Sequence, residues 1–274
     1  MATGGDERRM VFDIRGRRRY AIKVIYAILA VLMGASLFLV VGPLNIGEIF
    51  SGGGGNGGEA AKTFEEQAAR IERKLKKQPG DPDLLASLTR AHVTAANTLT
   101  EVEASGQRVV TPEALQQLQE ASQSWTEYLK ATKEPAAGVG QLVAPAMFQL
   151  AEVSTGGEIE PNLEAAAQAQ EIVAKQRPNL NTLSTLAIYR LFTFDYKQAE
   201  AAADQAKKYA HTKFERENVD NQLKETRKRA ESFQQQLVTY EKALAKASKS
   251  GGGAGAESLQ NPFGGLGGSS GLGE

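Results

Sequence analysis

Few residues in this sequence are of the types that carry out chemistry. The chain has no cysteine, which excludes disulfides, thiolate metal ligands and cysteine nucleophiles. Its two histidines, His92 and His211, are too few for most metal centres. Acidic side chains are plentiful, but the prominent ones lie near Lys or Arg, as is usual on a solvated surface: Glu65, Glu66, Glu225 and Glu231.

Sequence motifs of catalysis are also missing. The chain contains no phosphate-binding GxxxxGK[ST], no HExxH of zinc proteases and no GxSxG of serine hydrolases. The glycine run at 52–58 lacks the lysine of a phosphate loop. We expect Trp125 to pack in a core, His92 to lie in a core or at the edge of a groove, and His211 to lie at a helix end that stabilises an imidazolium. The sequence therefore predicts no enzyme, no cofactor and no metal site.

The charged residues are balanced overall but unevenly placed. The formal net charge is zero, with 32 Lys and Arg against 32 Asp and Glu, so a nucleic-acid partner is not expected. Residues 1–50, however, carry seven basic and four acidic side chains. Five of the basic ones form a cluster, which we call the basic flank: Arg15, Arg17, Arg18, Arg19 and Lys23.

An apolar segment follows the basic flank. Residues 24–41 are almost wholly apolar and contain no charge. Eighteen helical residues span about 27 Å, close to the roughly 30 Å of a bilayer's hydrocarbon core. The sequence thus predicts one transmembrane helix at 20–45. A cleaved signal peptide is the alternative, but its apolar core would be shorter, and Gly42-Pro43 is a poor place for cleavage.

The basic flank also predicts an orientation. Lys and Arg are enriched on the cytoplasmic side of spans, and none occurs here from 24 to 61. We therefore expect residues 1–19 in the cytoplasm and the chain beyond the span outside it. The predicted location is the cytoplasmic (plasma) membrane of a bacterium, crossed once.

Two glycine-rich segments divide the rest of the chain. Residues 46–59 include SGGGGNGG and are a predicted linker. Residues 251–274 hold ten glycines and are a predicted disordered tail, whose NPFGGLGG stretch is either a docking motif or low-complexity sequence. Between them, residues 60–250 are predicted to form an all-α domain.

The helices of this domain follow from its patterns. Apolar residues recur at spacings of three and four, and Pro and Gly interrupt them. Asp81-Pro82 and Thr111-Pro112 each supply a capping side chain followed by a proline suited to a first helical turn. The predicted helices cover 60–78, 82–104, 112–133, 140–154, 160–176, 179–193, 196–210 and 213–248.

Residues 183–206 resemble a tetratricopeptide repeat (TPR), a pair of antiparallel helices. The match rests on a large-large-small pattern in the first helix, a turn, and small residues in the second helix: Leu183, Leu186 and Ala187, then Asp195-Tyr196, then Ala199 and Ala206. Arg190 and Ala203 stand where the family has large packing residues, and His211 replaces the closing proline. With looser matches at 71–92, Pro135 and Pro178, the resemblance extends over about 60–210.

The resemblance implies a solenoid of helical hairpins, in which each pair covers the apolar face of the next, tethered to one transmembrane helix. The long last helix carries an apolar heptad from Leu223 to Ala247 and is predicted to cap the solenoid. A coiled coil formed by the same heptad is the alternative.

In TPR proteins, the first helices line a concave groove that holds an extended peptide or a partner helix. The resemblance places eight residues there: Asp83, Ala86, Arg90 and Val93 in one unit, and Asn181, Ser184, Ile188 and Leu191 in another. Only Arg90 and Asn181 fit the set that grips a C-terminal carboxylate in some members, so a helix or unfolded segment is the favoured ligand. We expect Lys207 and Lys208, on a second helix, to face solvent.

Together these features predict a single-pass membrane scaffold or adaptor that binds a protein or peptide partner and is chaperone-like in secretion or envelope assembly. The alternative is a structural subunit that forms a homo-oligomer through its C-terminal helix. An enzyme or transporter component with unrecognised chemistry is a third, less supported hypothesis.

Overall fold

The computed structural model describes residues 57–102, 108–249 and 262–263, which belong to one compact unit, Gly55–Glu274. The predicted transmembrane helix, the basic flank and most of the tail lie outside these residues. Within the described part, no helix is both long and apolar enough to cross a membrane.

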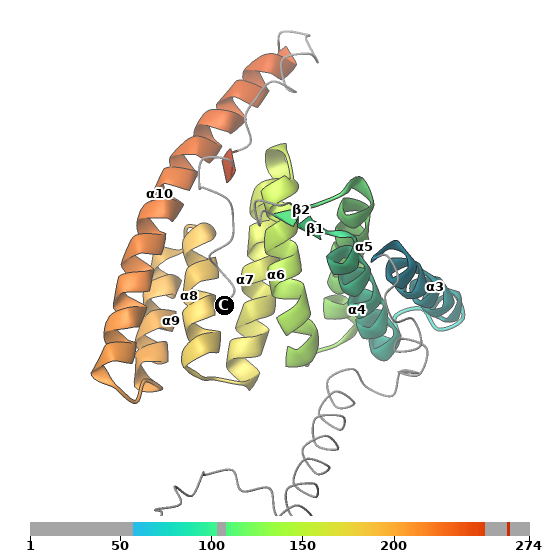
Figure 1. Cartoon of the computed structure of the whole chain (residues 1–274), viewed down its shortest axis with the longest axis horizontal. Coiled ribbons are helices and arrows are strands. Elements are labelled where there is room, and N and C mark those ends of the chain that lie inside the picture. The colour runs from blue at the N-terminus through green and yellow to red at the C-terminus, as the bar shows by residue number, and fades with distance from the viewer. Residues whose placement is uncertain (1–56, 103–107, 250–261, 264–274) are drawn as a thin grey trace, which may run out of the picture. The chain divides into compact units, whose positions relative to one another are not determined.

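The described chain is built almost entirely of α-helices, as predicted (Figure 1). The helices are α3 (Gly57–Leu75), α4 (Pro82–Leu99), α5 (Pro112–Ala131), α6 (Ala137–Val153), α7 (Ile159–Gln176), α8 (Leu180–Phe192), α9 (Tyr196–Lys208) and α10 (Lys213–Lys249). A short 3₁₀ turn, η1 (Gly156–Glu158), precedes α7. All eight helices predicted within residues 60–250 are present, and most of their ends agree within three residues.

Local capping explains this agreement. The Asp81 carboxylate accepts hydrogen bonds from the backbone N–H groups of Asp83 and Leu84, and the Thr111 hydroxyl accepts one from Ala114. Asn179 and Thr182 form a reciprocal capping box at the start of α8. These side chains satisfy N–H groups that a helix start leaves unpaired, so the sequence near each start determines where the helix begins.

The largest error in the predicted helices is the end of α4. The prediction ran to residue 104, but α4 ends at Leu99 and is followed by two short antiparallel strands, β1 (Glu101–Val102) and β2 (Arg108–Val109). The Thr111 hydroxyl donates to the carbonyl of Leu99 at 3.2 Å, which ties the end of α4 to the start of α5. This contact spans twelve residues, so helical periodicity alone does not reveal it.

Each helix packs against the next one in the sequence, and α4 also contacts α6, as α8 contacts α10. Helices α6 and α7 approach closely at Gly140, where an added Cβ atom would lie 2.7 Å from the backbone oxygen of Ala169. Gln176, at the end of α7, accepts a hydrogen bond from the backbone N–H of Ala137 at 3.0 Å. The α7 side chain thus replaces the cap that α6 lacks at its own start.

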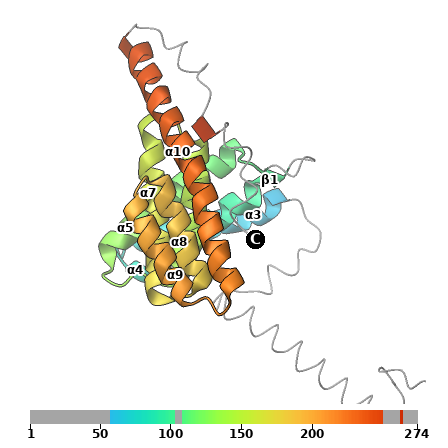
Figure 2. The ribbon, with the colours of Figure 1, turned by 90° about the vertical axis from the view of Figure 1, so that its left-hand side faces the viewer.

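Helix α10 lies along α8 and α9 (Figure 2). Four residues of its predicted heptad are buried against the domain core: Ala230, Phe233, Leu237 and Tyr240. The Tyr196 hydroxyl of α9 donates to Gln234 Oε1 at 3.0 Å, and the Arg227 guanidinium lies 5.0 Å from the centre of the Tyr196 ring. The heptad therefore covers the end of the helical domain, as the capping prediction proposed.

Candidate functional site

Five aromatic side chains from three helices and one turn gather in the second half of the domain. They are Phe148 on α6, Tyr189 and Phe192 on α8, Phe194 in the turn after α8, and Phe233 on α10. We call these residues the aromatic cluster. The Phe148 ring lies 5.4 Å from Tyr189 and 5.3 Å from Phe192, centre to centre, and Phe192 meets Phe233 edge to face at 6.1 Å. Such separations are typical of favourable aromatic contacts.

The turn between α8 and α9 positions Phe194. This residue has φ of 60°, the one positive value at a non-glycine residue within the described chain. Its N–H donates to the carbonyl of Leu191 at 3.0 Å, and its ring packs 6.0 Å from Phe233. A non-glycine residue in this conformation is uncommon, and the ring contact with α10 helps to hold it there.

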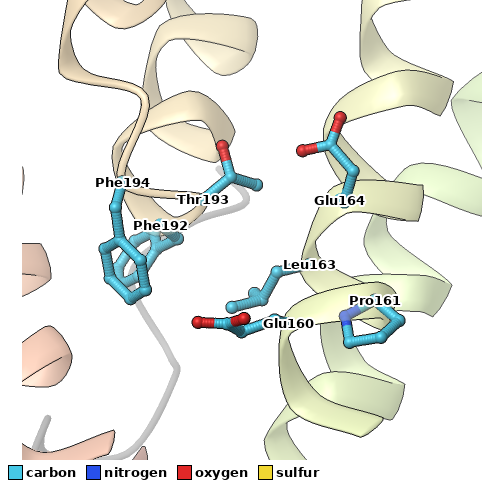
Figure 3. A pocket seen from close by; sticks show the side chains of 7 residues that line it. All are labelled: Glu160, Pro161, Leu163, Glu164, Phe192, Thr193 and Phe194. Carbon is cyan, nitrogen blue, oxygen red and sulfur yellow. The ribbon is translucent and has the colours of Figure 1, made fainter. Parts of the chain in front are cut away.

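A pocket of about 330 Å³ opens beside the cluster (Figure 3). Three of its lining residues come from the end of α8 and the turn, and four from the start of α7: Phe192, Thr193 and Phe194, and Glu160, Pro161, Leu163 and Glu164. Figure 3 shows the two carboxylates on the α7 side and the aromatic rings across from them. The pocket thus combines an apolar aromatic wall with two acidic groups.

One of these carboxylates belongs to a charged contact between α7 and α8. Arg190 is 7% exposed, and its Nη1 donates to Glu164 Oε1 at 2.9 Å while its Nη2 donates to Glu171. Lys175 also pairs with Glu171, at 2.6 Å. The hydrogen bond from Lys175, together with that from Arg190, holds the pKa of Glu171 below its ordinary value despite partial burial. Arg190, which replaces an aromatic residue of the TPR pattern, therefore joins two helices through charge.

Tyr189 is the buried ionisable member of the cluster. Burial raises the pKa of its phenol to about 12, and the nearby charge on Glu152 acts in the same direction. The phenol is consequently neutral throughout the physiological range. It contributes apolar surface and a hydroxyl group, and no titration near neutral pH.

A segment distant in the sequence covers part of the aromatic cluster. Pro262 is buried, and the Phe263 ring lies 4.4 Å from Phe233 and 6.2 Å from Phe148. Figure 1 shows this short turn in dark red beside α10. Phe263 packs against the main core of the domain. The tail residue Phe263 thus packs against aromatic side chains of α6 and α10, and Pro262 next to it is buried.

The predicted groove residues of α4 divide between surface and core. Asp83 and Arg90 are exposed, whereas Ala86 is buried and Val93 is 1% exposed in the main core. The Val93 side chain is therefore not on an open surface.

The predicted groove residues of α8 divide in the same way. Asn181 is exposed and Ser184 is half-buried, whereas Ile188 and Leu191 are in the core, Leu191 at 1% exposure. Phe192 follows Leu191 directly and both joins the cluster and lines the pocket. A shift of one residue turns a helical side chain by about 100°, so the one-repeat alignment was too coarse to select Phe192.

Other members of the site were not predicted at all. Three of these residues lie on separate elements: Phe148, Phe194 and Phe233. Of the three, only Phe233 belonged to a predicted feature, the apolar heptad of the last helix. The available signal was the concentration of phenylalanine after residue 147, including Phe263 in the NPF stretch. No local spacing indicates that these rings meet.

Two further residues singled out in the sequence, Trp125 and His92, are buried in the helical domain. Trp125 is buried, as predicted, and His92 is buried with its Nδ1 at 2.8 Å from Gln117 Oε1 and 3.1 Å from Glu120 Oε2. Among the described residues, no group of three or more His, Asp or Glu side chains is arranged to hold a metal ion.

The two lysines expected to face solvent differ. Lys208 is exposed, but Lys207 is half-buried and pairs with Asp220 of α10 at 2.8 Å and with Asp204 at 2.9 Å. The prediction for Lys207 is wrong because it did not include the packing of α10 on α9. Through its ion pair with Asp220, Lys207 links α10 to α9.

Comparison of this chain with protein families, with curated proteins and with solved structures finds no significant match.

Proposed function

We propose that this chain is a membrane-anchored adaptor whose helical domain binds an extended segment of a partner protein. The binding face consists of the aromatic cluster and the adjoining pocket. One observation carries the proposal: aromatic side chains of α6, α8 and α10 meet in the domain core, where each is at most 7% exposed, and a residue from a distant part of the chain packs on them. A surface that accepts one tail phenylalanine has the shape and polarity to accept another.

The order of the helices supports a TPR-like interpretation. The hairpins are α4–α5, α6–α7 and α8–α9, so α4, α6 and α8 are the first helices, with α10 in the next first-helix position. The contacts of α4 with α6 and of α8 with α10 join successive first helices. Stacking of this kind leaves an extended face for binding, as in repeat solenoids.

The chemistry of the site supports recognition of an extended chain with an apolar anchor. Buried aromatic anchors contribute much of the energy of protein interfaces. Glu164 is already paired with Arg190, so the Glu160 carboxylate adds the charge complementarity for a basic partner residue beside that anchor. The predicted span at 20–45 and the basic flank favour a location of the helical domain outside the cytoplasm.

The alternative, self-association through α10, has less support. The central residues of the heptad, from Ala230 to Tyr240, are already buried within the domain, and Leu223 and Leu244 on either side are half-buried, which leaves little of the heptad for a second copy. Two apolar α10 side chains do remain exposed, Phe214 and Val238. They are separated by more than six helical turns and do not form one seam.

Site-specific photocrosslinking in the native membrane tests the proposal. A photoreactive amino acid replaces Glu160, an exposed residue that lines the pocket, and in a matched control replaces Lys208, an exposed residue of α9. We expect heterologous adducts from position 160 and far fewer from position 208, with the crosslinked partner peptide identified by mass spectrometry. Equal adducts from both positions would contradict the site, and adducts between copies alone would favour the self-association alternative.

A further inference from the structure

The tail contact has the features of a bound ligand. Residues 250–261 separate α10 from Pro262, and yet Pro262 is buried and Phe263 packs on α6 and α10. The Phe263 ring contacts Phe233 at 4.4 Å, which is the shortest ring separation involving Phe233. The same ring meets Phe148 edge to face, with an angle of 81° between their planes.

The chemistry of the two residues suits this position. Proline has no backbone N–H, so one polar group fewer needs a partner when Pro262 is buried. Phenylalanine supplies a large rigid surface with few rotatable bonds. Beyond Phe263 the sequence continues with Gly264 and Gly265, which offer no side chain to clash with the cluster.

The contact is also small enough to be reversible. Burying one ring contributes a modest favourable free energy. Fixing the backbone and side chain of each tail residue costs conformational entropy, so this burial compensates for the ordering of only a few residues. Attachment through a short linker nevertheless gives a tethered segment an effective concentration in the millimolar range. A weak ligand can therefore occupy the cluster when it is part of the chain and still be displaced by a tighter partner.

We infer that the aromatic cluster is a binding site for extended segments in which phenylalanine follows proline, and that Pro262–Phe263 occupies it in cis as a built-in competitor. This inference rests on the proposed function and specifies its ligand. A partner segment enters by displacing Phe263 from Phe233 and Phe148. The tail thereby sets a threshold of partner affinity or concentration below which the site remains covered.

A peptide-binding measurement on the intact chain, purified in detergent, tests the inference. The probe is a fluorescein-labelled synthetic peptide of residues 256–268, AESLQNPFGGLGG, and the readout is fluorescence anisotropy. Phe263→Ala removes the cis ring, so we expect this variant to bind the probe about tenfold more tightly than the unaltered chain, given an effective concentration of order 1 mM and a probe Kd of order 0.1 mM. A probe with Ala in place of its Phe should bind neither protein.

Two controls separate this effect from a change in fold. Leu266→Ala alters another apolar residue of the same tail and should leave probe binding at the level of the unaltered chain. Phe148→Leu, introduced together with Phe263→Ala, keeps an apolar side chain but removes the ring and should weaken probe binding several-fold. Circular dichroism checks that all variants remain helical.

The outcomes distinguish this inference from the proposed function. Equal probe affinity with and without Phe263 overturns the cis competitor, and absence of binding to the Phe263→Ala variant overturns the ligand class. Crosslinking to partners from position 160 that persists in either case leaves the adaptor function standing. Tight probe binding without such crosslinks would contradict the adaptor function alone.

Discussion

At the scale of single residues, Arg190 shows how a departure from a repeat pattern can be stabilising. A large packing residue is expected at this position, but the arginine side chain reaches past the α7–α8 contact to Glu164 and Glu171. Its stem is buried while its charged end meets two partly exposed carboxylates. The position is thus buried like a packing residue and adds a charged link between α7 and α8.

We predict that Arg190→Ala lowers the free energy of unfolding by about 2–3 kcal/mol, because it removes charge-assisted hydrogen bonds and leaves a cavity. Exposure of the two carboxylates keeps the loss below that of a fully buried ion pair. Urea denaturation measures the change. Arg177→Ala, at an exposed position, is the control and should alter stability little; a similar loss at both positions would refute the role of Arg190.

Glu171 gives the same contact a pH dependence. Its pKa is lower in the folded chain than its ordinary value of 4.5, so the stability that it contributes is complete above that pH and is lost as the pH falls through the folded pKa. Between pH 5 and pH 3 we therefore expect the unaltered chain to lose more stability than Glu171→Gln does. Urea midpoints across this range provide the measurement, and parallel losses would show that Glu171 does not contribute.

At the scale of secondary structure elements, the close approach of α6 and α7 depends on one glycine. A methyl group at Gly140 would lie 2.7 Å from the Ala169 carbonyl oxygen and 3.2 Å from Val173 Cγ2. The first of these atoms belongs to the backbone of α7, so it cannot move away as a side chain can. Small residues on the facing surface of α7, including Ala166 and Ala169, keep the two helices close.

Gly140→Ala should therefore destabilise the domain by about 1–2 kcal/mol, since overpacking outweighs the better helix propensity of alanine. The matched control is Gly138→Ala in the same helix, where an added Cβ has no neighbour within 4 Å. That variant should be neutral or more stable by up to about 1 kcal/mol. Thermal unfolding followed by circular dichroism distinguishes the two, and equal effects would contradict the close approach.

At the scale of the whole molecule, the described domain and the predicted membrane anchor make different contributions. The domain supplies the aromatic cluster and a pocket, and we expect the predicted anchor to set the side of the membrane on which they lie. The basic flank is the sequence feature on which that side depends, because acidic residues near a span have a weak effect.

We expect a reporter fused after residue 250 to be active outside the cytoplasm. Neutral replacement of the basic flank should shift part of the population to the opposite orientation, because those charges favour the cytoplasmic side. Neutral replacement of Asp6, Glu7 and Asp13 is the control and should change little. A reporter that is active only in the cytoplasm would contradict the predicted topology.

Within the described residues, the sequence by itself determined the number of helices and most of their ends, because capping residues, prolines and apolar spacing act over a few neighbouring positions. Asp81 and Thr111 begin their helices as local hydrogen bonding requires. The sequence also indicated that the last helix caps the domain, since its single apolar seam needs one surface to cover it.

The tertiary structure alone decided which side chains meet. Phe148, Phe192 and Phe233 come together through the stacking of α6, α8 and α10, and Phe263 joins them from a distant segment. The pairing of Lys207 with Asp220 likewise depends on where α10 lies. Such contacts are fixed by the rotation of each helix and by the packing of neighbouring helices, and one position along a helix turns a side chain by about 100°. Local spacing cannot resolve that rotation across elements, whereas close packing in the folded domain selects one value.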